Sequence, residues 1–173
     1  MLQRSAGMPL TILSPAFDDH APIPALHTCD GEDAAPPLGW SAPPPHTTTF
    51  ALIVDDPDAP DPAAPKRTYV HWVVYDIPAA VRELEEGAGG AALPDGAREG
   101  RNDGGSTGYT GPCPPVGRHR YFFKLYALDT ALGDLGTPTK ADLERAMEGH
   151  VLERAQIVGT YERGGGRTKE GRR

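Results

Sequence analysis

Glycine and proline interrupt this sequence so often that only short regular elements fit between them. The 173 residues include 21 glycines and 19 prolines, residue types that end or weaken both helices and strands. The apolar residues gather in short dense blocks between these breakers, a pattern typical of strands. We therefore expect a mainly β protein with few helices.

Five blocks have the composition of strands. They are residues 10–13, 50–54, 69–77, 121–128 and 156–161, each bounded by Pro, Gly or Asp. A short helix is also expected over residues 79–86, before Gly87. The connections between the strands are long, and loops of this kind often shape a binding site.

A further helix is predicted near the C-terminus. Thr139 can cap its first turn, and Asp142, three residues later, completes a capping-box pattern. Leu143, Met147 and Val151 then repeat at four-residue spacing, which places them on one face of a helix. This face is expected to pack against a sheet.

Length and charge argue against several classes of protein. The chain is long enough for one domain, expected over residues 1–163 and followed by a disordered basic tail, 164–173. A net charge of −7 argues against nucleic acid as a partner. No apolar stretch approaches the roughly 20 residues of a membrane helix. The N-terminus lacks the apolar core of a signal peptide, so a cytoplasmic location is expected.

The two cysteines leave two possibilities open. Cys29 and Cys113 are the only cysteines, so they can form at most one internal disulfide. In a cytoplasmic protein such a pair more often stays as thiols. A bridge between them remains a further possibility.

Strand alternation predicts which side chains share a face. In the segment 69–77, a regular strand places His71 on the same face as Tyr69, Val73 and Tyr75. Each apolar stripe of the predicted strands meets a polar residue at one end. These polar ends are the candidate site residues.

Antiparallel pairing would bring the polar ends together. Asp56 closes one strand, His71 lies near the start of the next, and His119 and Tyr121 begin a later strand directly after a Gly/Pro loop. In an antiparallel sheet these ends meet at one rim. The sequence therefore predicts a small cavity with a carboxylate, two imidazoles and a phenol, and a floor formed by residues 111–115.

Three segments resemble signature blocks of the phosphatidylethanolamine-binding protein family. They are residues 55–60 (DDPDAP), 69–78 (YVHWVVYDIP) and 111–121 (GPCPPVGRHRY). The sequence is most similar to the bacterial branch, the Raf kinase inhibitor-like proteins, and the similarity runs from about residue 14 to residue 163. The resemblance implies a β-sandwich of antiparallel sheets with a few peripheral helices, and a pocket that accepts phosphate-like anions.

The residues of that pocket follow from the matched blocks and the loop between them. The candidate ligand-binding residues are Asp56, His71, Gly111, Pro112, Cys113, Pro114, Pro115, His119 and Tyr121. No catalytic residue, metal or cofactor is implied. The resemblance also makes Ala59–Pro60 the peptide bond to examine for a cis conformation. Eukaryotic members have a Trp and a second His where this chain has Tyr69 and Val70.

These residues can bind an anion through N–H and O–H donors. The expected donors are the two imidazoles, the phenol of Tyr121 and main-chain N–H groups of the loop at Gly111 and Cys113. Asp56 would repel an anion, so it is expected to pair with His71 or His119. The sequence thus predicts a binding module for a small anionic or phosphorylated ligand, with a kinase or protease as a possible protein partner and a homodimer as a possible assembly.

Two other functions fit parts of the sequence. Cys113 lies near His71, His119 and Asp56 in the predicted arrangement, and these are the residue types of a cysteine hydrolase. The segment 27–32 (HTCDGE) holds four candidate metal ligands. However, no second Cys/His pair stands at the spacing usual for zinc.

Overall fold

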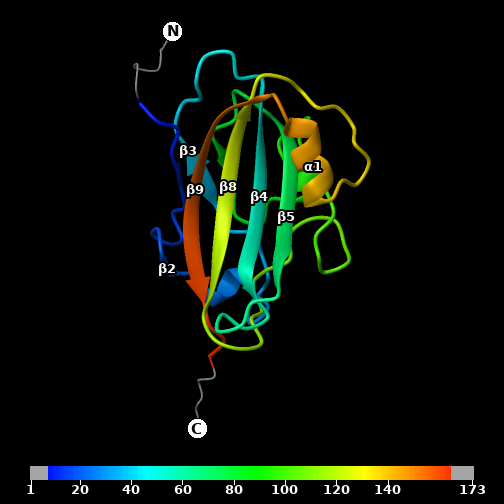
Figure 1. Cartoon of the computed structure of the whole chain (residues 1–173). Helices are drawn as coiled ribbons and strands as arrows, with labels where there is room; N and C mark the ends of the chain where they lie inside the picture. The colour runs from blue at the N-terminus through cyan, green and yellow to red at the C-terminus, as the bar shows by residue number, and fades with distance from the viewer. Residues whose placement is uncertain (1–7, 165–173) are drawn as a thin grey trace.

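The computed structural model describes residues 8–164, and these residues form two β-sheets that pack face to face (Figure 1). In order, the larger sheet contains β2 (Ala21–Pro22), β9 (Val151–Tyr161), β8 (His119–Leu128), β4 (Thr49–Ala59), β5 (Arg67–Pro78) and β7 (Arg98–Glu99). The smaller sheet contains β1 (Ile12–Leu13), β3 (Leu38–Trp40) and β6 (Glu83–Leu84). All pairs are antiparallel except β2 with β9.

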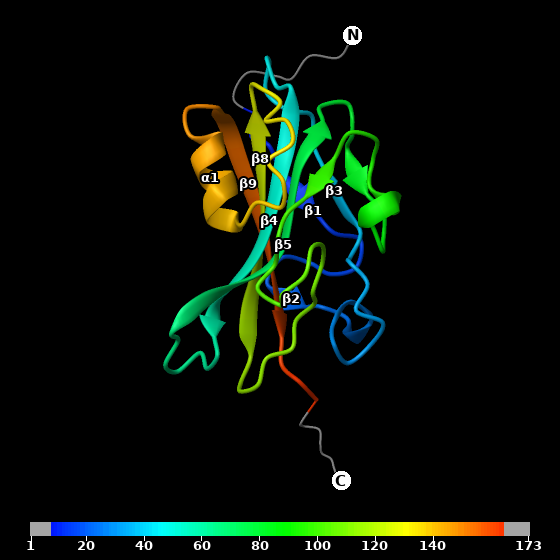
Figure 2. The same ribbon diagram turned by 90° about the vertical axis from the view of Figure 1, so that its right-hand side faces the viewer.

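The main core lies between the two sheets. Figure 2 shows the smaller sheet on one side of the larger sheet and helix α1 (Lys140–Met147) on the other. Apolar side chains of β4, β5 and β8 meet those of the smaller sheet in one buried cluster, which includes Phe50, Leu52, Trp72, Phe123, Leu125, Leu38, Trp40 and Leu84. The predicted mainly β sandwich is therefore confirmed.

Helix α1 covers part of the outer face of the larger sheet. Its N-terminus has the predicted capping box between Thr139 and Asp142, and Leu143 and Met147 are buried against that face. The helix stops at Met147, and Gly149 adopts a positive φ of 82° that favours glycine. Val151 therefore begins β9 rather than continuing the helix, contrary to the prediction. Within residues 8–164, no helix has both the length and the apolar character to cross a membrane.

The predicted helix over residues 79–86 is wrong. The segment makes a turn in which the Val81 N–H donates to the Pro78 carbonyl, and it then enters β6. Trp40 accounts for this conformation. Its indole N–H donates to the Val81 carbonyl and its main-chain N–H donates to the Arg82 carbonyl. Pairing with the smaller sheet thus replaces the local helical hydrogen bonds.

The predicted disordered tail lies, from residue 165 on, outside the described residues.

A β-bulge in β5 sets the direction of His71. Val54 of β4 pairs with Trp72, and the next residue, Asp55, pairs with Val70, so His71 is the extra residue. The His71 ring contacts the rings of Tyr69 and Tyr121, on the side of the main core. Val73 and Tyr75 instead pack on the α1 side. The predicted shared face of His71, Val73 and Tyr75 is therefore wrong, because the bulge interrupts the alternation.

Candidate ligand-binding site

The polar ends of β4, β5 and β8 meet at one end of the larger sheet. Nδ1 of His119 lies 2.6 Å from Oδ2 of Asp56. The ring centroids of His71 and Tyr121 are 5.2 Å apart, and those of His119 and Tyr121 are 6.3 Å apart. The convergence predicted from strand pairing is therefore present, and these four side chains surround one cavity.

The cavity has a volume of about 490 Å³. It is lined by Cys29, Asp33, Asp56, Ala59, Pro60, Arg67, Tyr69, His71, Thr110, Gly111, Cys113, Pro114, Pro115, His119 and Tyr121. Of the predicted site residues, Pro112 alone is not part of this lining, and its carbonyl accepts from the Cys29 N–H at 3.1 Å. The Ala59–Pro60 bond is cis, as the resemblance implied.

The lining also contains residues that the sequence did not single out. Arg67 lies opposite Ala59 where β4 and β5 pair, so strand pairing could have placed it at this rim. Its guanidinium forms an ion pair with Asp103 and lies over the Tyr69 ring. Asp33 comes from a distant loop, and no local pattern in the sequence indicates that it reaches the cavity.

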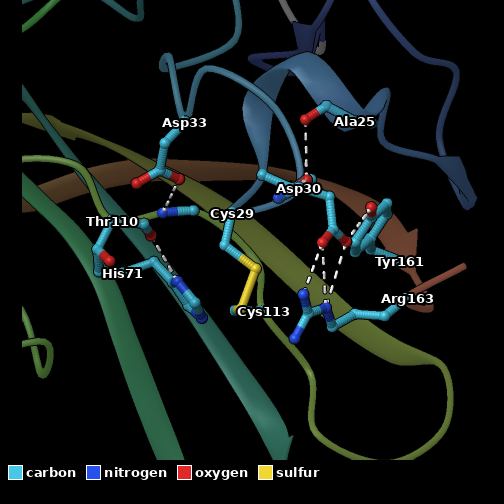
Figure 3. The surroundings of a disulfide bond; sticks show 11 residues. Ala25, Cys29, Asp30, Asp33, His71, Thr110, Cys113, Tyr161 and Arg163 are labelled. Atoms are coloured by element: carbon cyan, nitrogen blue, oxygen red, sulfur yellow. Dashed lines mark hydrogen bonds and ion pairs between the residues drawn. A yellow bond between two sulfur atoms is a disulfide. The ribbon is translucent and has the colours of Figure 1, made fainter. Parts of the chain in front are cut away.

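A disulfide joins the two loops that form one wall of the cavity (Figure 3). Cys29 and Cys113 are bonded to each other, so the expectation that they stay as thiols is wrong and the alternative of a bridge is confirmed. The loops also approach closely, because the Gly111 N–H donates to Asp33 at 2.9 Å. A Cβ at Gly111 would lie only 2.4 Å from the His27 carbonyl oxygen.

The disulfide also removes the hydrolase alternative. A cysteine nucleophile reacts as a thiolate, and the sulfur of Cys113 is bonded to Cys29 instead. Three of the four candidate metal ligands of the segment 27–32, Cys29 among them, likewise have other partners. Nδ1 of His27 is 2.9 Å from the Ala34 carbonyl oxygen, and Asp30 accepts from Tyr161 and Arg163.

Asp56 and His119 form a buried pair that leaves neither imidazole nitrogen of His119 for a ligand. Nε2 of His119 lies 2.9 Å and 3.1 Å from the carbonyl oxygens of Val116 and Pro60. Since carbonyls only accept, Nε2 carries a proton. Two lone pairs would repel each other at the 2.6 Å between Nδ1 and Asp56, so a second proton lies between them and the pair has no net charge. The other carboxylate oxygen of Asp56 accepts from the Asp58 N–H at 2.7 Å. The predicted Asp–His pairing is present, but His119 is not a ligand donor.

His71 has one ring nitrogen that remains available. Its Nδ1 lies 2.6 Å from the carbonyl oxygen of Thr110, as the dashed line in Figure 3 shows. Among the described residues, no hydrogen-bond partner lies within reach of its Nε2. Burial lowers the pKa of His71 below its ordinary value, although the Thr110 carbonyl and nearby carboxylates oppose this effect. The ring is therefore neutral at pH 7.

The hydroxyl of Tyr121 is the second available group. The residue is 1% exposed, and nothing within residues 8–164 forms a hydrogen bond with its hydroxyl. Burial raises the pKa of this phenol, with nearby Asp56 contributing in the same direction. Tyr121 therefore stays protonated and can donate. The predicted donor at Gly111 is not available in the same way, because its N–H already donates to Asp33.

Comparisons with known proteins identify the family of this chain. The family model described as phosphatidylethanolamine-binding protein matches residues 13–162. The chain belongs to this family. A relative in the family, a UPF0098 protein of Methanothermobacter thermautotrophicus, is 50% identical over 150 residues, which cover 86% of this chain and 96% of the relative. The resemblance noted in the sequence is thus confirmed.

Solved structures of the phosphatidylethanolamine-binding protein family show the same fold. A putative family homologue from Chlamydia trachomatis superposes with a TM-score of 0.81 at 40% identity, over 89% of this chain and 97% of the other. YbcL of Escherichia coli gives a TM-score of 0.78 at 34% identity, over 90% of this chain and 99% of the other. The family is named for binding, in agreement with the prediction of a binding protein rather than an enzyme.

Proposed function

We propose that the cavity binds a small phosphate-type anion, held by Nε2 of His71 and the hydroxyl of Tyr121. The observation that carries this proposal is that both groups are buried beside the cavity without a protein partner in the described part of the chain. A buried polar group without a partner costs about 1–3 kcal/mol, so such a pair indicates a place for a ligand. The family name, which refers to a phospholipid, supports the same chemistry.

The charges around the cavity make His71 the residue that responds to the anion. The Asp56–His119 pair has no net charge, and the guanidinium of Arg67 is balanced by Asp103 at 3.0 Å. The free site is therefore not strongly positive. An anion beside Nε2 of His71 favours a proton between that nitrogen and the anion, and this proton comes either from solvent or from the ligand.

Affinity for a phosphate monoester is expected to fall as the pH rises. Burial keeps the pKa of free His71 below 6.5, and an adjacent anion raises it in the complex. The extra stabilisation is present below the raised pKa of the complex and is lost as the pH rises through it. Calorimetry with methyl phosphate between pH 5.5 and 8.5 should show up to about a tenfold loss of affinity per pH unit.

Tyr121→Phe provides the matched variant for this measurement. It removes only the hydroxyl, so affinity for methyl phosphate is expected to fall about tenfold, the effect of one lost hydrogen bond. A pH-independent affinity, or an unchanged affinity in Tyr121→Phe, would argue against the proposed site.

Regulation of a kinase or protease, and assembly into a homodimer, stay predictions. The geometry of residues 8–164 supports neither of these two predictions. The proposal is therefore limited to the binding of a small ligand.

A further inference from the structure

We infer that the ligand carries its own proton into the site, so that the cavity selects a protonated phosphate monoester over a sulfate monoester of similar shape. This inference rests on the proposed function and adds a rule for which anions bind. It follows from the direction of the hydrogen bond between His71 and Thr110, and from the Tyr121 hydroxyl, which lies beside His71 as a donor.

The hydrogen bond to Thr110 sets the tautomer of His71. The Thr110 oxygen that lies 2.6 Å from Nδ1 is a main-chain carbonyl, which can only accept a hydrogen bond. Nδ1 therefore carries the proton. A neutral imidazole has only one N–H, so Nε2 presents a lone pair. In the resting site this nitrogen is an acceptor, not the donor that an anion requires.

The surroundings of His71 do not supply the missing proton. The ionisable groups around His71 are Asp33 from the facing loop, Asp55 and Asp56 from β4, Arg67 and Tyr69 from β5, and His119 and Tyr121 from β8. Asp55 is engaged by Lys124 and Lys140. The carboxylates favour a protonated His71, but burial has the larger effect and keeps the ring neutral.

The donor and the acceptor of the site match some anions better than others. Tyr121 donates an O–H and His71 offers a lone pair, so a matching ligand accepts at one oxygen and donates from another. The monoanion of a phosphate monoester does this, since its P–O⁻ can accept from Tyr121 and its P–OH can donate to Nε2. A sulfate monoester has acceptors only. Its complex must take a proton from solvent onto His71.

A charge-matched pair of probes tests the rule. The second pKa of a phosphate monoester is about 6, so at pH 5.5 methyl phosphate is mostly a monoanion with one P–OH. Methyl sulfate is a monoanion of nearly the same shape without that proton. Methyl phosphate is expected to bind at least about tenfold more tightly, since a site that hydrogen-bonds a hydroxyl rejects analogues that lack it. Calorimetry in two buffers of different ionisation enthalpy should also show greater proton uptake for methyl sulfate.

A variant of His71 should remove the selectivity. The amide of His71→Gln can present either N–H or C=O, so the affinity ratio of the two probes is expected to fall to within about threefold. His150→Gln is the control, because His150 is an exposed partner of Asp129 outside the cavity lining. The buffer comparison needs only the native protein, so it decides the question even if the His71 variant does not fold.

The outcomes separate the inference from the proposed function. Tighter binding of methyl phosphate, lost in His71→Gln and kept in His150→Gln, supports the inference. Equal affinities for the two probes, equal proton uptake, or a ratio unchanged in His71→Gln overturn the inference alone. Absence of binding by both probes overturns the proposed function and the inference with it.

Discussion

Replacing His119 with alanine is expected to lower the free energy of unfolding by about 3–5 kcal/mol, the effect of removing one partner of a buried ion pair. The side chains of His119 and Asp56 are 1% and 4% exposed. Without the imidazole, Asp56 keeps only the Asp58 N–H among its described partners. A carboxylate left in this position is strongly disfavoured. Urea denaturation of the native protein and the variant measures the difference.

Two further variants and one control show whether the unpaired charge of Asp56 causes the loss of stability in His119→Ala. Asp56→Asn is expected to cost no more than about 1.5 kcal/mol, because its amide can donate to Nδ1 of His119 and its oxygen can still accept from Asp58. The double variant with His119→Ala should be more stable than His119→Ala alone, since no buried charge remains. His150→Ala, which breaks an exposed pair with Asp129, should cost at most about 1 kcal/mol. A His119→Ala loss as small as that control would refute the buried-pair account.

Reduction of the disulfide between Cys29 and Cys113 is expected to lower the free energy of unfolding by about 2–5 kcal/mol. The bridge joins residues 84 positions apart, and a cross-link over so long a loop removes much conformational freedom from the unfolded chain. Both cysteines are exposed, so a reductant can reach them. Urea denaturation with and without reductant gives the difference.

The reduced protein should nevertheless keep its cavity. Three hydrogen bonds also join the two loops, from the Cys29 N–H to Pro112, from Gly111 to Asp33 and from Tyr109 to His27. Affinity for methyl phosphate should therefore change by less than about threefold on reduction. The double variant Cys29→Ser with Cys113→Ser is the control, because reductant should not affect its stability. Equal stability of the oxidised and reduced native protein would contradict the assigned bridge.

The frequency of glycine and proline made the fold predictable. Breakers on both sides of each apolar block limited the elements to strands, and the blocks 50–54, 69–77 and 121–128 lie in β4, β5 and β8. The errors arose where tertiary contacts override local pattern. Trp40 donates hydrogen bonds to the carbonyls of Val81 and Arg82, which would accept internal hydrogen bonds in a helix over residues 79–86.

The sequence predicted which residues surround the cavity better than what they do there. Strand pairing predicted that Asp56 and His119 lie close together. Only the three-dimensional structure shows that Nε2 of His119 is hydrogen-bonded to two carbonyls. The bulge at His71 could not be foreseen either, because an extra residue leaves no mark on the pattern of β5. Because of these hydrogen bonds, the proposed ligand-binding role belongs to His71 with Tyr121 rather than to both histidines.

The most direct test of this account is nuclear magnetic resonance of the protein with ¹⁵N-labelled histidine, titrated with methyl phosphate at pH 6. The free protein should show His71 with Nδ1 protonated and Nε2 unprotonated. Addition of methyl phosphate should shift the Nε2 signal of His71 strongly and leave the signals of His119 and His150 nearly unchanged. Saturable shifts at His119 with none at His71, or no shift at any histidine, would contradict the proposed site.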